Sequence, residues 1–335
     1  MKRNVWLVLA ILAFVATGVS AEGTKESPQM EEMTLRMGLI SSENHPITKA
    51  SRRFAEIISD KTDGKVTIQV MPGGSLGGEI EMHDMIASKT LDLGCFGSGV
   101  PSSYNPEFQI LLMPYLWKDW QTMIAFSKSD VMDSMNEKYT EKSKVRVLAS
   151  NWNQGERVTL SKRPINSIAD FKGLKIRVPQ LPSWIDMWKM VDANPTPIPF
   201  PEVYSALQQG VVDAVESPTN FMYSSSFYEQ AKYLVRTNHV MYFNMVFMND
   251  ALFQGMSKEL QNIFVEAAVE AGDYQNQLVQ DQLKDFEQKL KDEGVSFTDI
   301  DLQKMSQIMQ PLYEKWEDQF GAEIRAEIEA FKSSH

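Results

Sequence analysis

The sequence predicts an α/β protein built from two lobes, and three observations support this prediction. Short apolar segments alternate with longer helical segments from Met33 to Phe96, and the same alternation begins again after Asn151. A helical pattern from Lys258 to Glu293 is also longer than most helices of globular proteins. A strand–helix rhythm is typical of largely parallel sheets covered by helices, and two separate blocks indicate two such lobes.

The first block contains three predicted strands, over residues 33–40, 66–70 and 91–96. Helical segments lie between them, over residues 46–62 and from the loop 72–78 to about residue 89. Proline is tolerated in the first turn of a helix, so Pro46 suits the start of the earlier one. Asp63-Gly64 is a turn signal that separates this helix from the second strand.

The second block repeats the pattern with strands predicted over residues 156–160, 174–178 and 211–215. Helices are predicted over residues 167–171, 182–191 and 201–209. A further strand over residues 240–248 follows, and we expect it to return the chain to the first lobe.

The C-terminal part is predicted to be helical. Residues 258–293 place apolar side chains near helical spacing, and Gly272 with the polar stretch 275–282 interrupts the heptads that a coiled coil would need. A helix that spans both lobes explains the length of this segment better. A final helix is predicted from about residue 301 to residue 331.

The N-terminus has the features of a secretory signal peptide. Lys2 and Arg3 precede an uncharged apolar run over residues 5–15, and small residues end at Val19-Ser20-Ala21. The alternative is a membrane anchor, but the run is shorter than the roughly 20 apolar residues that a span requires. No cysteine follows the run, which argues against a lipid anchor. We therefore expect a signal peptide over residues 1–21, a loose polar leader over 22–32, and a periplasmic protein that begins near Glu22.

Composition narrows the classes of partner. The formal net charge is −11, which argues against nucleic acid or an anionic membrane as a partner. An anionic ligand would then need a local cluster of positive groups. Cys95 is the single cysteine, so no internal disulfide can form, and we expect it to be a small buried residue.

The usual enzyme signatures are missing from the sequence. The four histidines, at positions 45, 83, 239 and 335, do not stand at metal-ligand spacing, and there is no Gly-x-Ser-x-Gly motif. The loop Gly73–Gly78 matches neither a P-loop nor a dinucleotide-binding motif, so a tight turn into a helix explains its glycines better. We therefore expect binding without catalysis, with no cofactor and no metal.

Arg177 is the strongest candidate for a ligand contact. The strand 174–178 alternates apolar residues with Lys175 and Arg177, and Pro179 ends it. Ligands of open α/β folds bind at the carboxyl ends of strands, where Arg177 stands. The arginine fork fits a carboxylate with two hydrogen bonds. The alternative is a solvated or salt-bridged surface arginine.

Two segments resemble a known family. They are residues 163–179 (RPINSIADFKGLKIRVP) and 193–214 (ANPTPIPFPEVYSALQQGVVDA). Both are similar to the solute-binding proteins of tripartite ATP-independent periplasmic (TRAP) transporters, the DctP family. Weaker matches lie at residues 74–79, 112–116 and 237–239, so the resemblance covers essentially the whole mature chain. In this family the carboxylate-binding arginine occupies the place of Arg177.

The resemblance also implies a set of further ligand contacts. Arg157 matches a second arginine that often helps to bind the ligand. Trp152 and Asn153, expected in the turn before its strand, match an aromatic wall and a polar contact. Phe200 matches an aromatic residue of the pocket, and Ser98 falls where polar contacts are common. Many members read Glu-Asn-Pro where this chain reads Glu216-Ser217-Pro218, and a serine offers one hydroxyl in place of an amide. This difference puts sialic acid and typical sugar-acid specificity in doubt.

The fold that the resemblance implies is a two-lobe, type II-like periplasmic binding protein with hinge strands and a long helix that spans the lobes. Lobe I is expected over residues 33–150 and about 243–282, and lobe II over 151–242 and about 283–335. The lobes would close on a small organic acid, with sugar acids leading and dicarboxylates, 2-oxo acids and aromatic acids following. A monomer would then deliver the acid to the small and large subunits of a membrane permease. The alternatives are an ABC-type or sensory binding protein, or a periplasmic enzyme acting on sugar acids.

Overall fold

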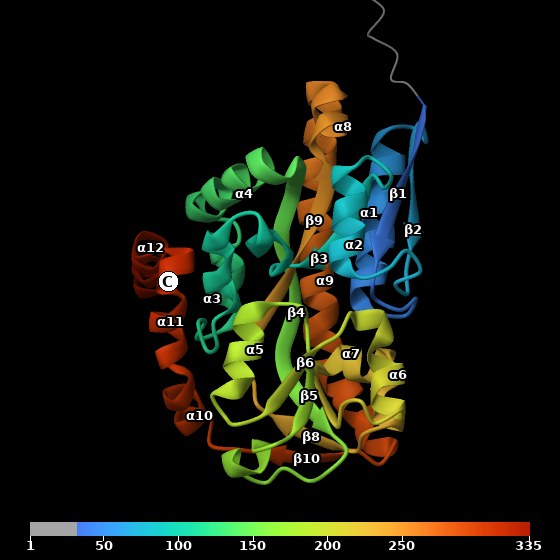
Figure 1. Cartoon of the computed structure of the whole chain (residues 1–335). Coiled ribbons are helices and arrows are strands. Elements are labelled where there is room, and N and C mark those ends of the chain that lie inside the picture. The colour runs from blue at the N-terminus through green and yellow to red at the C-terminus, as the bar shows by residue number, and fades with distance from the viewer. Residues whose placement is uncertain (1–31) are drawn as a thin grey trace, which may run out of the picture. The chain divides into compact units, whose positions relative to one another are not determined.

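Strand β4 runs along much of the molecule and connects its two lobes, with β9 paired to its first part and the long helix α9 packed on it (Figure 1). The computed structural model describes residues 32–335, which form one compact unit. The predicted signal peptide over residues 1–21 and nearly all of the leader 22–32 lie outside the described residues. Among residues 32–335, no helix is both long enough and apolar enough for a membrane span.

The strands form one continuous sheet in the order β2-β1-β3-β9-β4-β7-β5-β6, with β8 paired to β4 and β10. Strands β1 to β3 pair in parallel and define the first lobe, while β5 to β8 with β10 define the second. Strand β4 pairs antiparallel with β9 in its first part and with β7 and β8 in its last part. The strands are β1 (Met33–Leu39), β2 (Val66–Met71), β3 (Leu93–Gly97), β4 (Val145–Ser161), β5 (Lys175–Val178), β6 (Asn194–Pro197), β7 (Ala214–Pro218), β8 (Tyr233–Arg236), β9 (Met241–Asn249) and β10 (Ser296–Asp299).

Half of the α-helices in residues 32–335 begin at a side chain that accepts a hydrogen bond from the first turn, such as Asp119, Ser129 and Ser257. The α-helices are α1 (Pro46–Lys61), α2 (Glu79–Ala87), α3 (Trp120–Phe126), α4 (Asp130–Ser143), α5 (Pro182–Lys189), α6 (Val203–Gln208), α7 (Thr219–Ser224), α8 (Asp250–Gly255), α9 (Lys258–Asp292), α10 (Leu302–Met309), α11 (Pro311–Phe320) and α12 (Ala322–Ser334). Short 3-10 segments are η1 (Val100–Ser103), η2 (Pro106–Leu112), η3 (Ile168–Phe171), η4 (Phe200–Glu202) and η5 (Phe227–Glu229).

Helix α9 confirms the prediction of one very long helix. It has 35 residues, which corresponds to about 52 Å at 1.5 Å per residue. It packs on α1 in the first lobe, on β4, and on α7 in the second lobe. Gly272 faces the side chains of Asn151 and Trp152, and a Cβ built there would lie 2.6 Å from atoms of each. The glycine that interrupts the heptad pattern therefore allows α9 to approach β4 closely.

The structure corrects two of the predicted elements. The single final helix over residues 301–331 is wrong, because the segment forms α10, α11 and α12. Pro311 begins α11 without an amide hydrogen to donate, and Gly321 separates α11 from α12 with φ of 88°. The turn expected at Trp152 and Asn153 is also wrong, because β4 runs without a break from Val145 to Ser161. Bulges along its pairing with β9 accommodate the irregular stretch.

The C-terminal helices contact both lobes. The hydroxyl of Tyr313 on α11 donates to the carbonyl oxygen of Pro114 at 2.9 Å, and Trp316 Nε1 donates to Asp186 Oδ2 at 3.1 Å. In Figure 1 these helices lie along one side of the molecule, next to α3. The residue boundaries given above for lobe I and lobe II stay a prediction. Cys95 is buried on β3, as predicted, and burial raises the pKa of its thiol.

Candidate ligand-binding cavity

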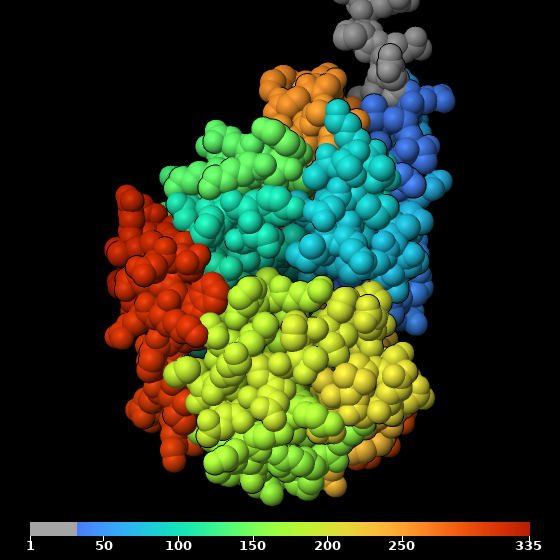
Figure 2. Space-filling view, in the orientation of Figure 1, coloured from blue at the N-terminus to red at the C-terminus, as the bar shows by residue number. Residues whose placement is uncertain are grey.

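A cavity of about 60 Å³ lies between the two lobes and is lined by residues of both. The first lobe contributes Glu79 at the start of α2, together with Ile40, Ile80 and Val100. The second lobe and the connecting strands contribute the other lining residues, Gln154, Arg157, Arg177, Pro179, Gln180, Leu181, Pro199, Phe200, Ser217, Phe221 and Tyr242. In the space-filling view the surfaces of residues near 75–110 and near 180–220 meet in front of this region (Figure 2). The structure therefore shows the lobes in contact around the cavity.

Arg157 on β4 forms a buried ion pair with Glu216 on β7. Arg157 Nε donates to Glu216 Oε2 at 2.6 Å and Nη2 donates to Oε1 at 2.9 Å, while Nη1 donates to Gln154 Oε1 at 3.2 Å. The guanidinium also stacks on Trp184 and Tyr242, with its carbon 4.6 and 5.2 Å from the ring centroids. Glu216 therefore matches the charge of Arg157 within the protein itself.

His239 contacts the same carboxylate, at the oxygen that also accepts from Arg157 Nε. Its Nε2 lies 3.2 Å from Glu216 Oε2, and its Nδ1 lies 2.9 Å from the hydroxyl of Thr237. Burial alone would raise the pKa of Glu216, but Arg157 and His239 outweigh it and leave that pKa below its usual value. Burial lowers the pKa of His239, so its imidazole is neutral and donates to Glu216. The group Arg157–Glu216–His239 is consequently a closed, charge-balanced network.

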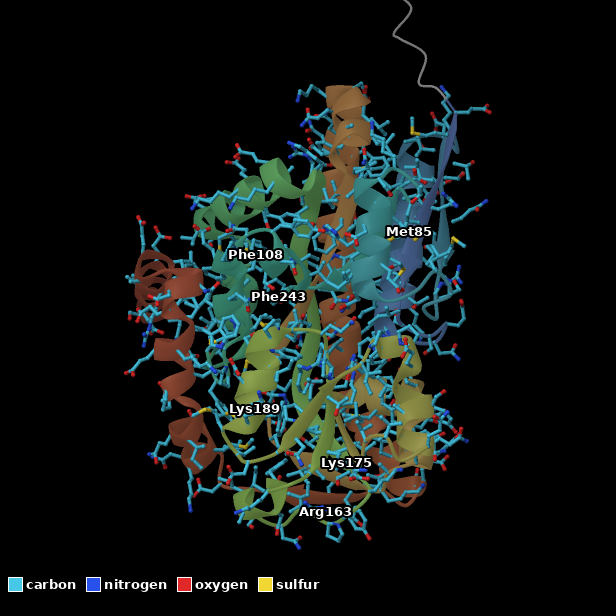
Figure 3. All side chains as sticks on the ribbon, in the orientation of Figure 1. Met85, Phe108, Arg163, Lys175, Lys189 and Phe243 are labelled. Carbon is cyan, nitrogen blue, oxygen red and sulfur yellow. The ribbon has the colours of Figure 1, made fainter. Side chains whose placement is uncertain are left out.

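Arg177 is the third residue of β5 and has no carboxylate partner among residues 32–335. Its side chain is 3% exposed, and Nε donates to the carbonyl oxygen of Ile198 at 2.9 Å. The structure shows no hydrogen-bond partner for its two terminal nitrogens within the described chain. Lys175, two residues earlier on the strand, lies exposed near the outer end of the second lobe (Figure 3).

Burial lowers the pKa of Arg177 to about 10. The negative charges of Glu216 and Glu79 oppose this shift, and the like charge of Arg157 adds to it. The side chain is thus still a cation at neutral pH. Neither of these carboxylates forms an ion pair with Arg177, and a buried cation without a contacting counterion is costly unless an anion joins it. The fork of Arg177 therefore presents two donors, at one end of the cavity, to an anionic group.

Glu79 places a carboxylate in the cavity from the first lobe. Its Oε1 accepts a hydrogen bond from the amide of Gly97 at 3.0 Å, and burial raises its pKa. The structure shows no ion pair for Glu79 within the described residues, although Arg157 and Arg177 act on it through space. Its second oxygen can therefore accept hydrogen bonds from hydroxyl groups of a ligand.

The rest of the cavity is aromatic, apolar or weakly polar. Phe200 on η4 lies beside Arg177, with the guanidinium carbon 5.6 Å from its ring centroid. Phe221 packs against Phe200 at 5.1 Å, and the hydroxyl of Tyr242 accepts from the amide of Gly99 at 2.8 Å. Ser217 on β7 is 2% exposed and presents a hydroxyl to the same space.

Four of the predicted contact residues, Arg177, Arg157, Phe200 and Ser217, line this cavity. Trp152 does not, because its side chain packs toward α9 and Nε1 donates to the carbonyl oxygen of Ala268 at 2.8 Å. Ser98 is also absent from the lining; its hydroxyl is buried without a partner, and its amide donates to the carbonyl oxygen of Phe243. The aromatic wall comes from Phe200, Phe221 and Tyr242 instead of Trp152.

Asn153 lines a different cavity, of about 340 Å³, on the other side of the connecting strand. Its carboxamide oxygen accepts from the backbone amide of Gly155, and its backbone amide donates to Asn276 Oδ1 on α9. Gly155 has φ of 104°, and the pairing of β4 with β9 shifts register next to it. This irregularity turns Asn153 away from Arg177, while Gln154 lines both cavities.

Four polar lining residues were not predicted from the sequence: Glu79, Gln154, Gln180 and Tyr242. Glu79 ends the segment 74–79 that resembles the family, so this match could have indicated Glu79 as a residue of the cavity. Gln154 and Tyr242 lie on two strands far apart in the sequence, and only the pairing of β4 with β9 brings them together. No group of His, Cys, Asp and Glu side chains within residues 32–335 is arranged to hold a metal ion.

Comparison with known proteins gives a family match and close relatives. Residues 37–319 match the family model DctP, described as bacterial extracellular solute-binding protein, family 7. The sialic acid-binding periplasmic protein SiaP of Vibrio cholerae is 31% identical over 297 residues, covering 89% of this chain and 92% of that protein. The 2,3-diketo-L-gulonate-binding periplasmic protein YiaO of Escherichia coli is 32% identical, covering 88% of this chain and 89% of that protein.

A solved structure is equally similar. It is a TRAP periplasmic solute-binding protein from Roseobacter denitrificans with bound L-galactonate. The two folds superpose with a TM-score of 0.84 at 30% sequence identity, covering 90% of this chain and 99% of the other. The two-lobe α/β architecture is therefore confirmed.

Proposed function

The chain belongs to the DctP family of bacterial extracellular solute-binding proteins, and from this premise we propose that it captures a small hydroxylated carboxylic acid, a sugar acid in the first instance. The observation that carries the proposal is the buried guanidinium of Arg177, which faces the cavity without a carboxylate partner in the described chain. An acid that placed its carboxylate on this fork would supply the missing anion.

The remaining groups of the cavity define the rest of the ligand. Glu79 is an acceptor for hydroxyl groups, and Ser217 can donate or accept one hydrogen bond. A second carboxylate on the ligand would have to lie near Glu79, which is unfavourable. Ile40, Ile80 and Leu181 offer only apolar contact, which suits the carbon chain of the acid. A monocarboxylate with one or more hydroxyls therefore fits better than a dicarboxylate.

Relatives with known ligands support this class. SiaP is named for sialic acid, YiaO for 2,3-diketo-L-gulonate, and the Roseobacter protein holds L-galactonate. All three ligands are hydroxylated acids. The role that we propose for this chain is to bind and release such an acid without changing it chemically, which distinguishes it from an enzyme of sugar-acid metabolism.

The location and partners that we propose follow from the same family. The chain would be exported to the periplasm and, as a single copy, deliver its acid to the small and large membrane subunits of a TRAP permease. N-terminal sequencing of the exported protein should give a start near Glu22, and light scattering should give the mass of one chain. Loss of acid uptake on deletion of this gene would support transport, whereas unchanged uptake would favour a sensory role.

A thermal-shift and calorimetry panel tests the ligand class. The purified protein is titrated with L-galactonate, 2,3-diketo-L-gulonate, sialic acid and, as the dicarboxylate control, succinate. A bound acid raises the melting temperature by mass action. We expect at least one hydroxylated monocarboxylate to bind and to be recovered unchanged. Binding of succinate alone, or conversion of a bound acid, would contradict the proposal.

A further inference from the structure

His45 is a buried histidine next to the cavity whose role the proposed function does not explain. It precedes α1 in the first lobe, its side chain is 0% exposed, and its Nδ1 accepts a hydrogen bond from the amide of Ile47 at 3.1 Å. This bond assigns the proton of the neutral ring to Nε2. Nε2 is buried and has no hydrogen-bond partner of normal geometry among the described residues.

The ring of His45 contacts the second lobe directly. It packs against Phe221 of α7 with the ring centroids 4.0 Å apart and the ring planes tilted by 35°. Phe221 packs against Phe200 at 5.1 Å, and Phe200 lies beside the Arg177 guanidinium. A continuous row of rings therefore runs from the first helix of the first lobe to the cation that we expect to hold the ligand.

A second connection passes through the neighbour of Phe221. Burial lowers the pKa of His45 to about 3, and the side chain of Asn220 acts in the opposite direction, which places Asn220 near the ring. Asn220 Nδ2 donates to the carbonyl oxygen of Gln154 at 3.2 Å, on the strand that connects the lobes. Gln154 in turn accepts from Arg157. Asn220, which precedes Phe221 in the sequence, is thus linked through Gln154 to the connecting strand and to Arg157.

The same edge of the cavity contains other close contacts between the lobes. A Cβ built on Gly74 would lie 2.7 Å from Pro201, and one built on Gly78 would lie 3.5 Å from Pro199. Both prolines flank Phe200 in the sequence. The loop 73–78, which has no phosphate-binding pattern, therefore lies against the segment that carries Phe200. These contacts, like that of His45, join residues of the first lobe to residues of the second.

We propose that His45 is a positioning residue of the cavity, whose ring holds Phe221 and Phe200 in place beside Arg177 while the lobes are closed and so slows release of the bound acid. The inference rests on the proposed binding function. Contacts that form only in the closed state slow dissociation and leave association nearly unchanged. His45 would act through Phe221 and would not touch the ligand.

Two substitutions separate this role from the role of His45 in starting α1. His45→Asn keeps a side chain that caps the helix but removes the ring. His45→Phe keeps the ring but removes the acceptor for the Ile47 amide. Melting temperatures are measured without ligand. Association and dissociation rates are measured by stopped-flow tryptophan fluorescence, with whichever of L-galactonate, 2,3-diketo-L-gulonate and sialic acid binds the wild type most tightly.

We expect opposite results from the two variants. His45→Asn should keep a melting temperature close to that of the wild type and release the acid about two to ten times faster, as expected for a lost aromatic pair. His45→Phe should melt at a lower temperature and release the acid at nearly the wild-type rate. The inference would be overturned if His45→Asn released the acid at the wild-type rate. It would also be overturned if, in both variants, a lower melting temperature simply went with faster release. Failure of the wild type to bind any of the three acids would be a separate result and would overturn the proposed function as well.

Discussion

Arg157 and Glu216 form a buried, two-pronged ion pair, with Arg157 Nε 2.6 Å from Glu216 Oε2 and Nη2 2.9 Å from Oε1. The pair leaves Arg177 as the arginine of the cavity whose charge no carboxylate of the described chain contacts. The two arginines thus have different roles in our account. Arg157 belongs to a network with Glu216 and His239, and Arg177 is available to a ligand.

The Arg157–Glu216 pair should be required for folding stability. Glu216→Gln removes one charge and leaves Arg157 buried without a counterion, which should lower the free energy of unfolding by about 3–5 kcal/mol. Denaturant unfolding of the ligand-free protein measures this. Asp213→Asn is the control, because Asp213 pairs with Lys175 at the surface and such pairs contribute less than about 1 kcal/mol. Equal effects of the two substitutions would contradict the assignment.

The cavity carboxylate Glu79 should select hydroxylated acids. Glu79→Gln keeps an oxygen for the amide of Gly97 but loses the charge that strengthens hydrogen bonds from ligand hydroxyls. Such bonds contribute about 1.5–3 kcal/mol, so L-galactonate should bind about 10- to 100-fold more weakly, if it is a ligand of the wild type. Hexanoate, which has the carboxylate and no hydroxyl, should not lose affinity. Calorimetry with both acids measures the difference, and a similar loss for hexanoate would count against this role.

His45 should make the stability of the protein depend on pH. Burial lowers its pKa from 6.5 to about 3, so the unfolded chain takes up a proton there before the folded protein does. The stabilisation that the neutral His45 ring gives the folded protein is therefore fully present above pH 6.5. It is lost as the pH falls toward 3, because the unfolded chain gains a proton on His45 that the folded protein does not. The difference in free energy of unfolding between the wild type and His45→Asn should change by up to about 1.4 kcal/mol per pH unit in that window. If the free energies of unfolding of the two proteins changed equally with pH between 6.5 and 4, this result would contradict the burial of His45.

Gly272 should be required for the packing of α9 on β4. Alanine is favoured over glycine in helices by about 1 kcal/mol, but overpacking typically costs about 1–3 kcal/mol. Because the new Cβ would lie 2.6 Å from Asn151 and Trp152, Gly272→Ala should destabilise the protein. Gly255→Ala at the end of α8 is the control, since nothing lies within 4 Å of its Cβ position, and it should be neutral or slightly stabilising. The opposite order of melting temperatures would refute this packing.

Much of the fold was predictable because its signals are local. The alternation of apolar strands and helices in two blocks predicted the α/β architecture, and the periodic pattern of residues 258–293 predicted α9; the structure confirms both. The division of the last segment into α10, α11 and α12 depends on how Pro311 and Gly321 interrupt a helical pattern that is otherwise continuous. The full length of β4 depends on β9, which is distant in the sequence and supplies the hydrogen bonds of its first part.

The site was predictable only in part, for a physical reason. Arg177, Arg157, Phe200 and Ser217 stand in segments that resemble the family, and all four line the cavity. Trp152 and Asn153 do not line it: Trp152 donates to a carbonyl of α9, and Asn153 lies next to a register shift in the pairing of β4 with β9. Glu79 enters from the other lobe, so tertiary structure is what brings it into the same cavity as Arg177.

Arg177 carries the central claim, and isothermal titration calorimetry of Arg177→Ala tests it most directly. The titrant is the acid that binds the wild type most tightly in the panel of sugar acids, and Lys175→Ala, an exposed position on the same strand, is the control. Loss of one partner from a buried ion pair costs about 3–5 kcal/mol, so binding to Arg177→Ala should weaken by about two to three orders of magnitude. Arg177→Lys should also bind more weakly, because a single ammonium cannot replace the fork. Near-normal affinity of folded Arg177→Ala would contradict the account.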